Sequence, residues 1–184
     1  MSRITAEQAL SVLREAELLC TPEQVDAALD RLAAAVTSRL EGRDPLVLMV
    51  MNGAFATAAR LLARLRFPLR VGYLHATRYR GGTRGGEMDW IAPPRPEVAG
   101  QVVLVVDDIF DEGDTLEAIL AEVRRRRATA MYSAVLVDKR HDRKVSGLTV
   151  DFVGLEVPDR YVFGCGMDYK EYWRQLPAIY AARD

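Results

Sequence analysis

The sequence has little cysteine, since Cys20 and Cys165 are the two residues of this type among 184. They lie far apart and form no Cys-x-x-Cys pair, which argues against a disulfide framework and against a structural zinc site. Such sparse usage is typical of a protein kept in a reducing compartment. We therefore expect a cytoplasmic protein.

Long hydrophobic runs are missing as well. The longest stretch without a charged residue, 45–59, contains Asn52 and Gly53, and it is shorter than the ~20 residues that a membrane-spanning helix needs. Near the start of the chain, acidic and basic residues interrupt every apolar stretch, a pattern that does not fit a secretory signal. We expect neither membrane anchoring nor export.

An excess of one charge is the third absence. Lysine and arginine total 25 and aspartate and glutamate total 26, which gives a net charge of −1. The chain thus lacks the basic character of most nucleic-acid-binding proteins, and we expect no nucleic-acid partner. What is present is ordinary for a globular protein, with 49% hydrophobic and 28% charged residues. The length fits one domain, which we predict over 1–184.

Helical spacing dominates residues 1–41, which we interpret as a helical N-terminal extension. Over 4–19, apolar residues recur on one face, namely Ala9, Val12, Ala16 and Leu19. A second helix has a clear start, because Thr21 can cap it, Pro22 suits its first position and Gln24 completes a capping box. Its apolar stripe consists of Val25, Leu29, Leu32, Val36 and Leu40.

Beyond Pro45, short apolar runs alternate with helical patterns. We predict strands at 46–51, 69–79, 87–92, 101–106, 132–137 and 148–153. Helical spacing is found for Phe55, Ala59 and Leu62, and again for Leu116, Ile119, Leu120 and Val123. This alternation is typical of an α/β domain with a largely parallel central sheet flanked by helices. In such sheets, ligands bind beyond the carboxyl ends of the strands.

The segment 102–116 carries the strongest chemical signal. Its apolar strand ends in Asp107 and Asp108, and a third acid, Asp111, precedes Gly113 and Thr115. The glycine permits a tight turn, after which the first amides of a helix form an anion site. Two neighbouring acids would repel a bare phosphate, so they indicate hydroxyl groups or a hard cation between protein and phosphate. A sugar phosphate meets both conditions.

A simpler interpretation covers part of this segment. Asp114 can cap the following helix, and Glu117 can complete a capping box with it. For these two residues we favour capping over a direct chemical role. The same interpretation does not explain Asp107 and Asp108, which follow directly on an apolar strand.

The segment resembles the signature of type I phosphoribosyltransferases, which bind 5-phosphoribosyl-1-diphosphate. The resemblance implies that Asp107 and Asp108 contact the ribose hydroxyls and help to hold Mg²⁺, and that Asp111 is the general base at purine N7. It also implies that the 5-phosphate lies in a loop formed by Glu112, Gly113, Asp114 and Thr115. Many family members have Thr-Gly-Lys-Thr in this loop. We explain the two acids here by backbone amides that bind phosphate while the acidic side chains point to solvent.

The C-terminal stretch 150–177 resembles the purine-binding end of hypoxanthine-guanine phosphoribosyltransferases. The resemblance implies that Tyr161 stacks on the purine and that the backbone of Val162 reads the edge of the base. It implies further that Asp168 holds Mg²⁺ and that Arg174 reaches the diphosphate. The alternative for the aromatic residues is that Tyr161 and Phe163 are core residues of a strand.

Lys139, just past a predicted strand, matches the lysine with which this family donates to the 6-oxo group of the purine. An ammonium group has donors and no acceptor, so it favours a carbonyl over an amino group. The resemblance therefore implies hypoxanthine or guanine rather than adenine. A solvated strand end is the alternative for a single lysine at this place.

Two upstream segments complete the resemblance. In 50–55, Asn52 and Gly53 occupy a short loop that touches diphosphate through backbone amides, although Asn52 stands where the family often has lysine. The glycine-rich stretch 76–90 matches the mobile loop that closes over the site, and Tyr79 aligns with its tyrosine. In the same stretch, Arg78, Arg80 and Arg84 can cover a polyanion.

Other polar residues receive no role in the chemistry. The arginine run at 124–127 ends a helix, where positive charge complements the dipole, so we favour a solvated surface over a nucleic-acid site. His75 and His141 have no partners at metal-ligand spacing, and we assign neither to catalysis.

The resemblance implies an Mg²⁺-dependent enzyme of purine salvage. It would transfer ribosyl-5-phosphate from phosphoribosyl diphosphate to hypoxanthine, and also to guanine, giving IMP or GMP and diphosphate. We expect a homodimer or homotetramer. Two alternatives stay open: a nucleotide-sensing, RNA-binding regulator that retains the fold, and a xanthine-preferring phosphoribosyltransferase.

Overall fold

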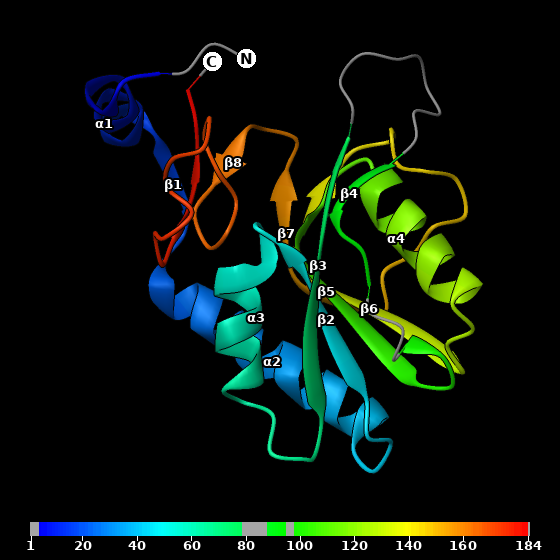
Figure 1. Cartoon of the computed structure of the whole chain (residues 1–184). Helices are drawn as coiled ribbons and strands as arrows, with labels where there is room; N and C mark the ends of the chain where they lie inside the picture. The colour runs from blue at the N-terminus through cyan, green and yellow to red at the C-terminus, as the bar shows by residue number, and fades with distance from the viewer. Residues whose placement is uncertain (1–3, 79–87, 95–97, 184) are drawn as a thin grey trace.

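A twisted six-stranded sheet with helices on both faces forms most of the molecule, and a smaller three-stranded sheet lies at one end (Figure 1). The computed structural model describes residues 4–78, 88–94 and 98–183. Its elements are α1 (Ala6–Glu15), β1 (Glu17–Cys20), α2 (Pro22–Leu40), β2 (Leu46–Met51), α3 (Ala54–Leu62), β3 (Arg70–Arg78), β4 (Met88–Ala92), β5 (Val102–Phe110), α4 (Asp114–Arg125), β6 (Ala130–Arg140), β7 (Phe152–Pro158), β8 (Val162–Phe163) and β9 (Ile179–Ala181).

The larger sheet has the strand order β4-β3-β2-β5-β6-β7. Neighbouring strands run parallel from β3 to β7, and β4 pairs antiparallel with β3 at the edge. The predicted fold class, α/β with a largely parallel central sheet flanked by helices, is therefore confirmed. Because β2, β5 and β6 are parallel neighbours, their carboxyl ends meet at one edge of the sheet, where a ligand is expected.

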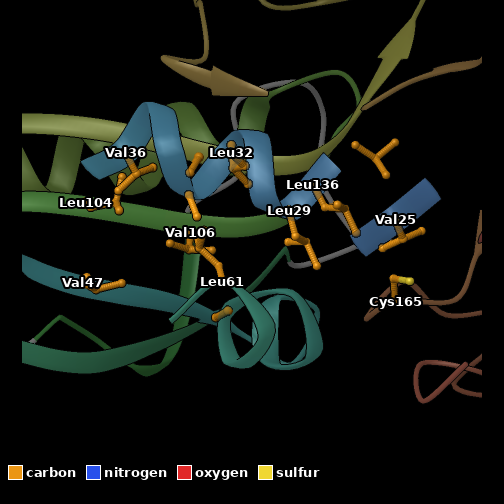
Figure 2. Packing of buried hydrophobic residues seen from close by; sticks show 14 of the residues in the cluster. Val25, Leu29, Leu32, Val36, Val47, Leu61, Leu104, Val106, Leu136 and Cys165 are labelled. Carbon is orange, nitrogen blue, oxygen red and sulfur yellow. The ribbon is translucent and has the colours of Figure 1, made fainter. Parts of the chain in front are cut away.

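The two faces of the sheet are covered by different helices. Alternate residues of β5 point in opposite directions, so Leu104 and Val106 pack with α2 and α3, while Val103 and Val105 pack with α4. Figure 2 shows Leu29 and Leu32 of α2 in the first of these layers. Burying one such leucine fully contributes roughly 1.5–3 kcal/mol relative to leaving it exposed.

Helix α2 agrees with its sequence pattern. Thr21 and Gln24 form both hydrogen bonds of the predicted capping box, and Pro22 is the first helical residue. The five residues of the predicted stripe are all buried: Val25, Leu29, Leu32, Val36 and Leu40. The prediction succeeds because its signals are local in the sequence.

The predicted helix over 4–19 is wrong in its second part. Helix α1 ends at Glu15, Ala16 has an extended backbone, and residues 17–20 form β1, which pairs antiparallel with β9. The small sheet has the order β1-β9-β8, so the segment 1–41 is not wholly helical. Pairing with a distant strand overrides the helical spacing of residues 16–19.

The predicted apolar face of α3 is only partly correct, because Leu62 packs against the core whereas Phe55 and Ala59 are exposed. The residues that face the sheet are Ala54, Ala58 and Leu61, whereas Phe55 is 42% exposed and Ala59 is exposed. Small alanine side chains on the inner face let the helix approach the sheet closely, and the larger Phe55 is turned outward. On the opposite face of the sheet, Leu116, Ile119 and Val123 of α4 are buried as predicted.

Several strand boundaries differ from the sequence prediction, most of all in β5, β6 and β7. Strand β5 continues to Phe110 and β6 to Arg140, so Asp107, Asp108 and Lys139 lie inside paired strands and not beyond their ends. Strand β7 starts only at Phe152, later than the predicted 148–153. The carboxylate of Asp151 accepts hydrogen bonds from the backbone N–H and the hydroxyl of Ser133 in β6. This contact lies just before the first residue of β7.

Both cysteines are free thiols. Cys165 is buried against α3, where its carbonyl accepts a hydrogen bond of 3.0 Å from the Thr57 hydroxyl. Burial raises the pKa of the Cys165 thiol to about 11, so the thiol stays protonated at neutral pH. Among the described helices, none combines the length and the apolar character needed to cross a membrane.

Some predictions reach beyond the described residues. Tyr79, Arg80 and Arg84 lie outside them, as does most of the predicted loop 76–90, although its two ends pair as β3 and β4. The single domain over 1–184, the homodimer or homotetramer and the cytoplasmic location stay predictions.

Candidate active site

A pocket of about 620 Å³ opens at the carboxyl edge of the larger sheet. This volume lies in the usual range for small-molecule sites, roughly 300–1,000 Å³. The pocket brings together the predicted site residues that the structure describes: Asn52, Gly53, Asp107, Asp108, Asp111, Glu112, Gly113, Asp114, Thr115, Lys139, Tyr161, Val162, Asp168 and Arg174. They come from the turn after β2, from β5 and the loop that leads into α4, from β6 and from the C-terminal stretch.

Two glycines allow three chain segments to meet in the wall of this pocket. A methyl group at Gly53 would lie 2.3 Å from Oδ2 of Asp108, and one at Gly166 would lie 2.0 Å from the carbonyl oxygen of Gly53. Gly166 also has a φ of +107°, which other residues rarely adopt. Glycine at these positions therefore brings the C-terminal stretch directly against the sheet.

Asp107 and Asp108 form a close acidic pair in this wall. The backbone N–H of Asp108 donates to Oδ1 of Asp107 at 2.9 Å, and Asp108 is 8% exposed. Removal from water, reinforced by the neighbouring charge of Asp108, raises the pKa of Asp107 well above its usual value. Burial also raises the pKa of Asp108. A hydroxyl donor or a cation near the pair would favour its ionised form.

The loop before α4 presents an uncapped helix start. Gly113 is the N-cap, with a φ of +95°, and no side chain caps the first turn. The predicted capping box of Asp114 and Glu117 is therefore wrong, because Asp114 is already helical and the position before it has no side chain. Gly113, Asp114 and Thr115 line the pocket, and this geometry suits an anion bound by backbone amides.

The side chain of Glu112 is exposed to solvent, as predicted, and its carboxylate faces Arg143. Its Oε1 lies 3.7 Å from Nε of Arg143, although both side chains are about half exposed, at 54% and 55%. The carbonyl of Glu112 accepts a hydrogen bond of 2.8 Å from the backbone of Val145. The loop is thus held from outside by the segment that follows β6, and Arg143 partly neutralises the unusual acid.

Asp111 is held by two cationic or polar side chains. Nζ of Lys139 lies 2.7 Å from its Oδ2, and Nε2 of His141 lies 2.7 Å from its Oδ1. Partial burial pushes the pKa of Asp111 upward, but the hydrogen bonds from Lys139 and His141 outweigh it, and the pKa lies below its usual value. Asp111 is therefore a carboxylate at neutral pH.

Sequence reasoning missed His141 as a member of this site. The signal was its spacing from Lys139, because residues two apart along a strand point to the same side. Phe110 pairs with Asp138 across β5 and β6, which brings the next residues, Asp111 and Lys139, side by side. His141 follows one step beyond the last residue of β6.

Asp111, His141 and Asp159 have ligand atoms within 4.8 Å of one another. Each of them already has a protein partner, since Asp159 accepts two hydrogen bonds from Arg143, at 2.7 and 2.9 Å. A divalent ion would have to displace these contacts. The geometry therefore describes a hydrogen-bonded cluster.

In the C-terminal stretch, Arg174 and Asp168 form an ion pair of 2.5 Å. Arg174 also donates to the carbonyl of Gly166 at 2.6 Å, and the other oxygen of Asp168 accepts from the backbone of Glu171 at 2.7 Å. Both side chains line the pocket. The arginine that was predicted to reach a diphosphate thus orients the acid that was predicted to hold a metal.

The aromatic residues of this stretch have different environments. Phe163 is fully buried in β8, as the strand-core alternative expects, whereas Tyr161 precedes the strand, lines the pocket and is 47% exposed. The Tyr161 ring packs edge-on to that of Tyr169 at a centroid distance of 5.1 Å. Tyr161 thus offers a ring to a ligand.

Comparison with known proteins agrees with this geometry. The phosphoribosyl transferase domain family matches residues 21–171. The chain belongs to the phosphoribosyltransferase family. The match includes helix α2. It also covers every described residue of the pocket except Arg174.

Individual relatives cover this phosphoribosyltransferase to different extents. It is 33% identical over 164 residues to the hypoxanthine-guanine phosphoribosyltransferase of Bacillus subtilis, covering 89% of this chain and 91% of that protein. It is also 33% identical to the bifunctional protein TilS/HprT of Listeria innocua, again over 89% of this chain, but it spans 25% of that protein's length.

A crystal structure of a hypoxanthine phosphoribosyltransferase from Staphylococcus aureus has the same fold. It superposes with a TM-score of 0.87 at 26% identity, covering 94% of this phosphoribosyltransferase and 95% of that chain. The similarity therefore extends over nearly the whole chain.

Proposed function

We propose that this phosphoribosyltransferase serves purine salvage by transferring ribosyl-5-phosphate from 5-phosphoribosyl-1-diphosphate to N9 of hypoxanthine, and also of guanine. The products are IMP or GMP and diphosphate. The observation that carries the proposal is a single pocket lined by an acid pair, an uncapped helix start, a lysine and an aromatic ring. Together these groups match a sugar phosphate and a planar base that bears a carbonyl.

The sugar phosphate fits the part of the pocket on β5 and α4. The ionised forms of Asp107 and Asp108 accept hydrogen bonds from the two ribose hydroxyls, which offset the desolvation of the carboxylates. The 5-phosphate binds to the amides of residues 112–115, with the Thr115 hydroxyl as a further donor. The backbone at Asn52 and Gly53 lies against the acid pair and suits the diphosphate group.

The base fits between the end of β6 and the C-terminal stretch. Tyr161 stacks on the purine, and the backbone of Val162 reads its edge. Lys139 donates one hydrogen bond to Asp111, and because an ammonium group has three donors, it retains donors for the purine 6-oxo group. Adenine has an amino group at this position, so its hydrogen-bond donor would face the ammonium donor of Lys139.

Mg²⁺ fits the chemistry of the acids that line the pocket. Asp168, Asp107 and Asp108 supply carboxylate oxygens, the ligands that a hard cation prefers. When bound with the substrate, Mg²⁺ would offset the charge of the diphosphate leaving group. Arg174 keeps Asp168 oriented toward this region and adds positive charge beside the diphosphate.

Proton transfer is the task that we assign to Asp111. Its lowered pKa keeps it ionised at neutral pH, so it can accept the proton at purine N7 as N9 bonds to the ribose carbon.

The test is a diphosphate-release assay with phosphoribosyl diphosphate, Mg²⁺ and one base at a time. We expect release with hypoxanthine and guanine, and little with adenine. Release with adenine alone would overturn the role of Lys139, and preferred release with xanthine would identify a xanthine-preferring enzyme. Release with none of the four bases would favour the RNA-binding regulator.

A further inference from the structure

His141 connects the candidate general base to the rest of the protein. Its side chain is 3% exposed. The backbone N–H of Arg143 donates to its Nδ1 at 3.1 Å, and its Nε2 lies 2.7 Å from Oδ1 of Asp111. Because an amide can only donate, Nδ1 is the acceptor, and the proton of the neutral ring is on Nε2. His141 therefore donates to Asp111.

The two oxygens of Asp111 are thus fixed by separate donors. Lys139 reaches Oδ2 from β6, and His141 reaches Oδ1 from the segment after β6. Two donors on opposite oxygens restrict the rotation of a carboxylate that is otherwise 43% exposed. If His141 were absent, Lys139 would be the remaining partner and the carboxylate would be free to turn about that contact.

The position of His141 is set by contacts outside the pocket. Arg143, which donates to its ring, forms two hydrogen bonds with Asp159 and lies near Glu112. The histidine is therefore anchored in the protein without a ligand. The chain contains a preformed support for Asp111.

We propose that His141 is a positioning residue, which holds the Asp111 carboxylate toward the purine through its Nε2–H and so leaves the other donors of Lys139 for the 6-oxo group. The inference rests on the proposed function and deepens it. His141 forms and breaks no bond in the reaction. Because Nδ1 is occupied by Arg143, the ring orients the base and does not relay its proton.

The charged groups around Asp111 determine how the loss of the His141 hydrogen bond changes the pH dependence of the activity. Lys139 faces it from β6, His141 and Arg143 face it from the next segment, and Glu112 follows it in its own loop. Asp159 lies beyond Arg143 and His141. Removing the donor of His141 takes away one of the two hydrogen bonds that favour the ionised carboxylate, so the acid limb of the activity profile moves to higher pH.

The experiment compares His141→Leu with His141→Gln in the hypoxanthine reaction. Leucine removes the donor, whereas the glutamine amide reaches about as far as Nε2 and can donate to Asp111. We expect kcat to fall about 10- to 100-fold in His141→Leu, as for a lost hydrogen bond to a charged group. The acid limb of the kcat profile should shift to higher pH, and the KM for phosphoribosyl diphosphate should stay within about threefold.

His141→Gln should recover most of kcat and the original acid limb. Equal losses in both variants with an unchanged pH profile would mean a packing role and would overturn the inference, as would normal kcat in His141→Leu. If His141→Leu does not fold, His141→Asn replaces it, because its shorter amide falls short of Asp111. Equal activity of the Asn and Gln variants would then overturn the inference.

The wild-type protein separates this inference from the proposed function. Release of diphosphate by the wild type supports the proposed function whatever the variants do. No release with any 6-oxopurine overturns the proposed function and the role of His141 together.

Discussion

Asp107 and Asp108 differ from Asp111 in one respect that matters for function, although all three lie within five residues on and just after β5. The pKa of each member of the pair is raised because burial removes it from water, and the charge of Asp108 acts further on Asp107. The pKa of Asp111 is lowered, because Lys139 and His141 outweigh its burial. The same type of side chain is thus protonated more readily at Asp107 and less readily at Asp111, four residues further along the chain.

The difference follows from which partners the protein supplies. Asp111 receives its donors from the protein itself, so its charge is settled before a substrate arrives. The acid pair lies inside β5, where burial raises the pKa of both carboxyls, so a bound ligand must supply the donors or the cation that favour their ionised form. In this chain, the acids proposed to bind the ligand and the acid proposed to take a proton therefore have opposite surroundings.

The largest effect is expected for Asp111→Asn, which removes the general base but keeps its shape. We expect kcat with hypoxanthine to fall roughly 10²- to 10⁴-fold, the usual contribution of acid–base catalysis. Thermal unfolding should change little. The control is Asp30→Asn. This change alters an exposed acid of α2 that pairs with Arg64 and lies away from the pocket. Near-normal turnover of Asp111→Asn would refute the proposed role of Asp111 as general base. It would also remove the functional contrast between Asp111 and the acid pair.

The second largest effect is expected for Gly166→Ala, which tests how the C-terminal stretch meets the acid pair. The new methyl group would lie 2.0 Å from the carbonyl of Gly53 at a positive φ, so we expect a loss of roughly 2–4 kcal/mol in the free energy of unfolding. Urea unfolding measures it. Gly42→Ala has a positive φ but no atom within 4 Å of the added methyl group. Equal losses in the two variants would show that the contact with Gly53 is unimportant.

Asp107→Asn tests the raised pKa of the pair directly. An acid whose pKa is raised on folding favours the fold below its unfolded pKa, and that contribution is lost as the pH rises through the folded value. At pH values above the folded pKa the ionised pair therefore opposes folding, and there the removal of one charge should stabilise the free protein by about 1 kcal/mol. Binding of phosphoribosyl diphosphate should weaken.

The measurements for Asp107→Asn are urea unfolding at several pH values and the KM for phosphoribosyl diphosphate. The stabilisation should shrink as the pH falls, because protonation neutralises the wild-type pair as well. A variant that is destabilised at every pH, or one with unchanged substrate affinity, contradicts this account of the pair.

The smallest effect is expected for Glu112→Gln. Its contact with Arg143 is long and exposed, so the free energy of unfolding should change by less than about 0.5 kcal/mol. With one negative charge less beside the phosphate loop, the KM for phosphoribosyl diphosphate should fall up to about threefold, most clearly at low salt. A large rise in KM would mean that the Glu112 side chain supports the loop more strongly than its geometry indicates.

Local signals in the sequence predicted part of this structure. The Thr21 capping box and the stripe of α2 depend on residues three or four apart, and both are confirmed. The apolar run before Asp107 predicted β5, because buried parallel strands are continuously hydrophobic. A capping box at Asp114 looked equally local, yet Gly113 took the capping position.

The remaining features depend on contacts between distant residues. Strand β1 forms because it pairs with Ile179–Ala181 at the other end of the chain. His141 meets Asp111 through the register of β5 and β6, and its spacing from Lys139 indicates a shared side of the strand without naming the partner. The position of Lys139 was predicted from a family resemblance, and its contact with Asp111 required the structure.

The order of the small sheet also bears on how the protein is made. Strand β9 lies between β1 and β8, so neither neighbour can be paired until the last strand of the chain has been synthesised. All six strands of the larger sheet, with the acid pair and the phosphate loop, have been synthesised by the time Pro158 is added. During translation the sugar-phosphate side can therefore form first, and the base side is completed only after Ile179–Ala181 has been synthesised.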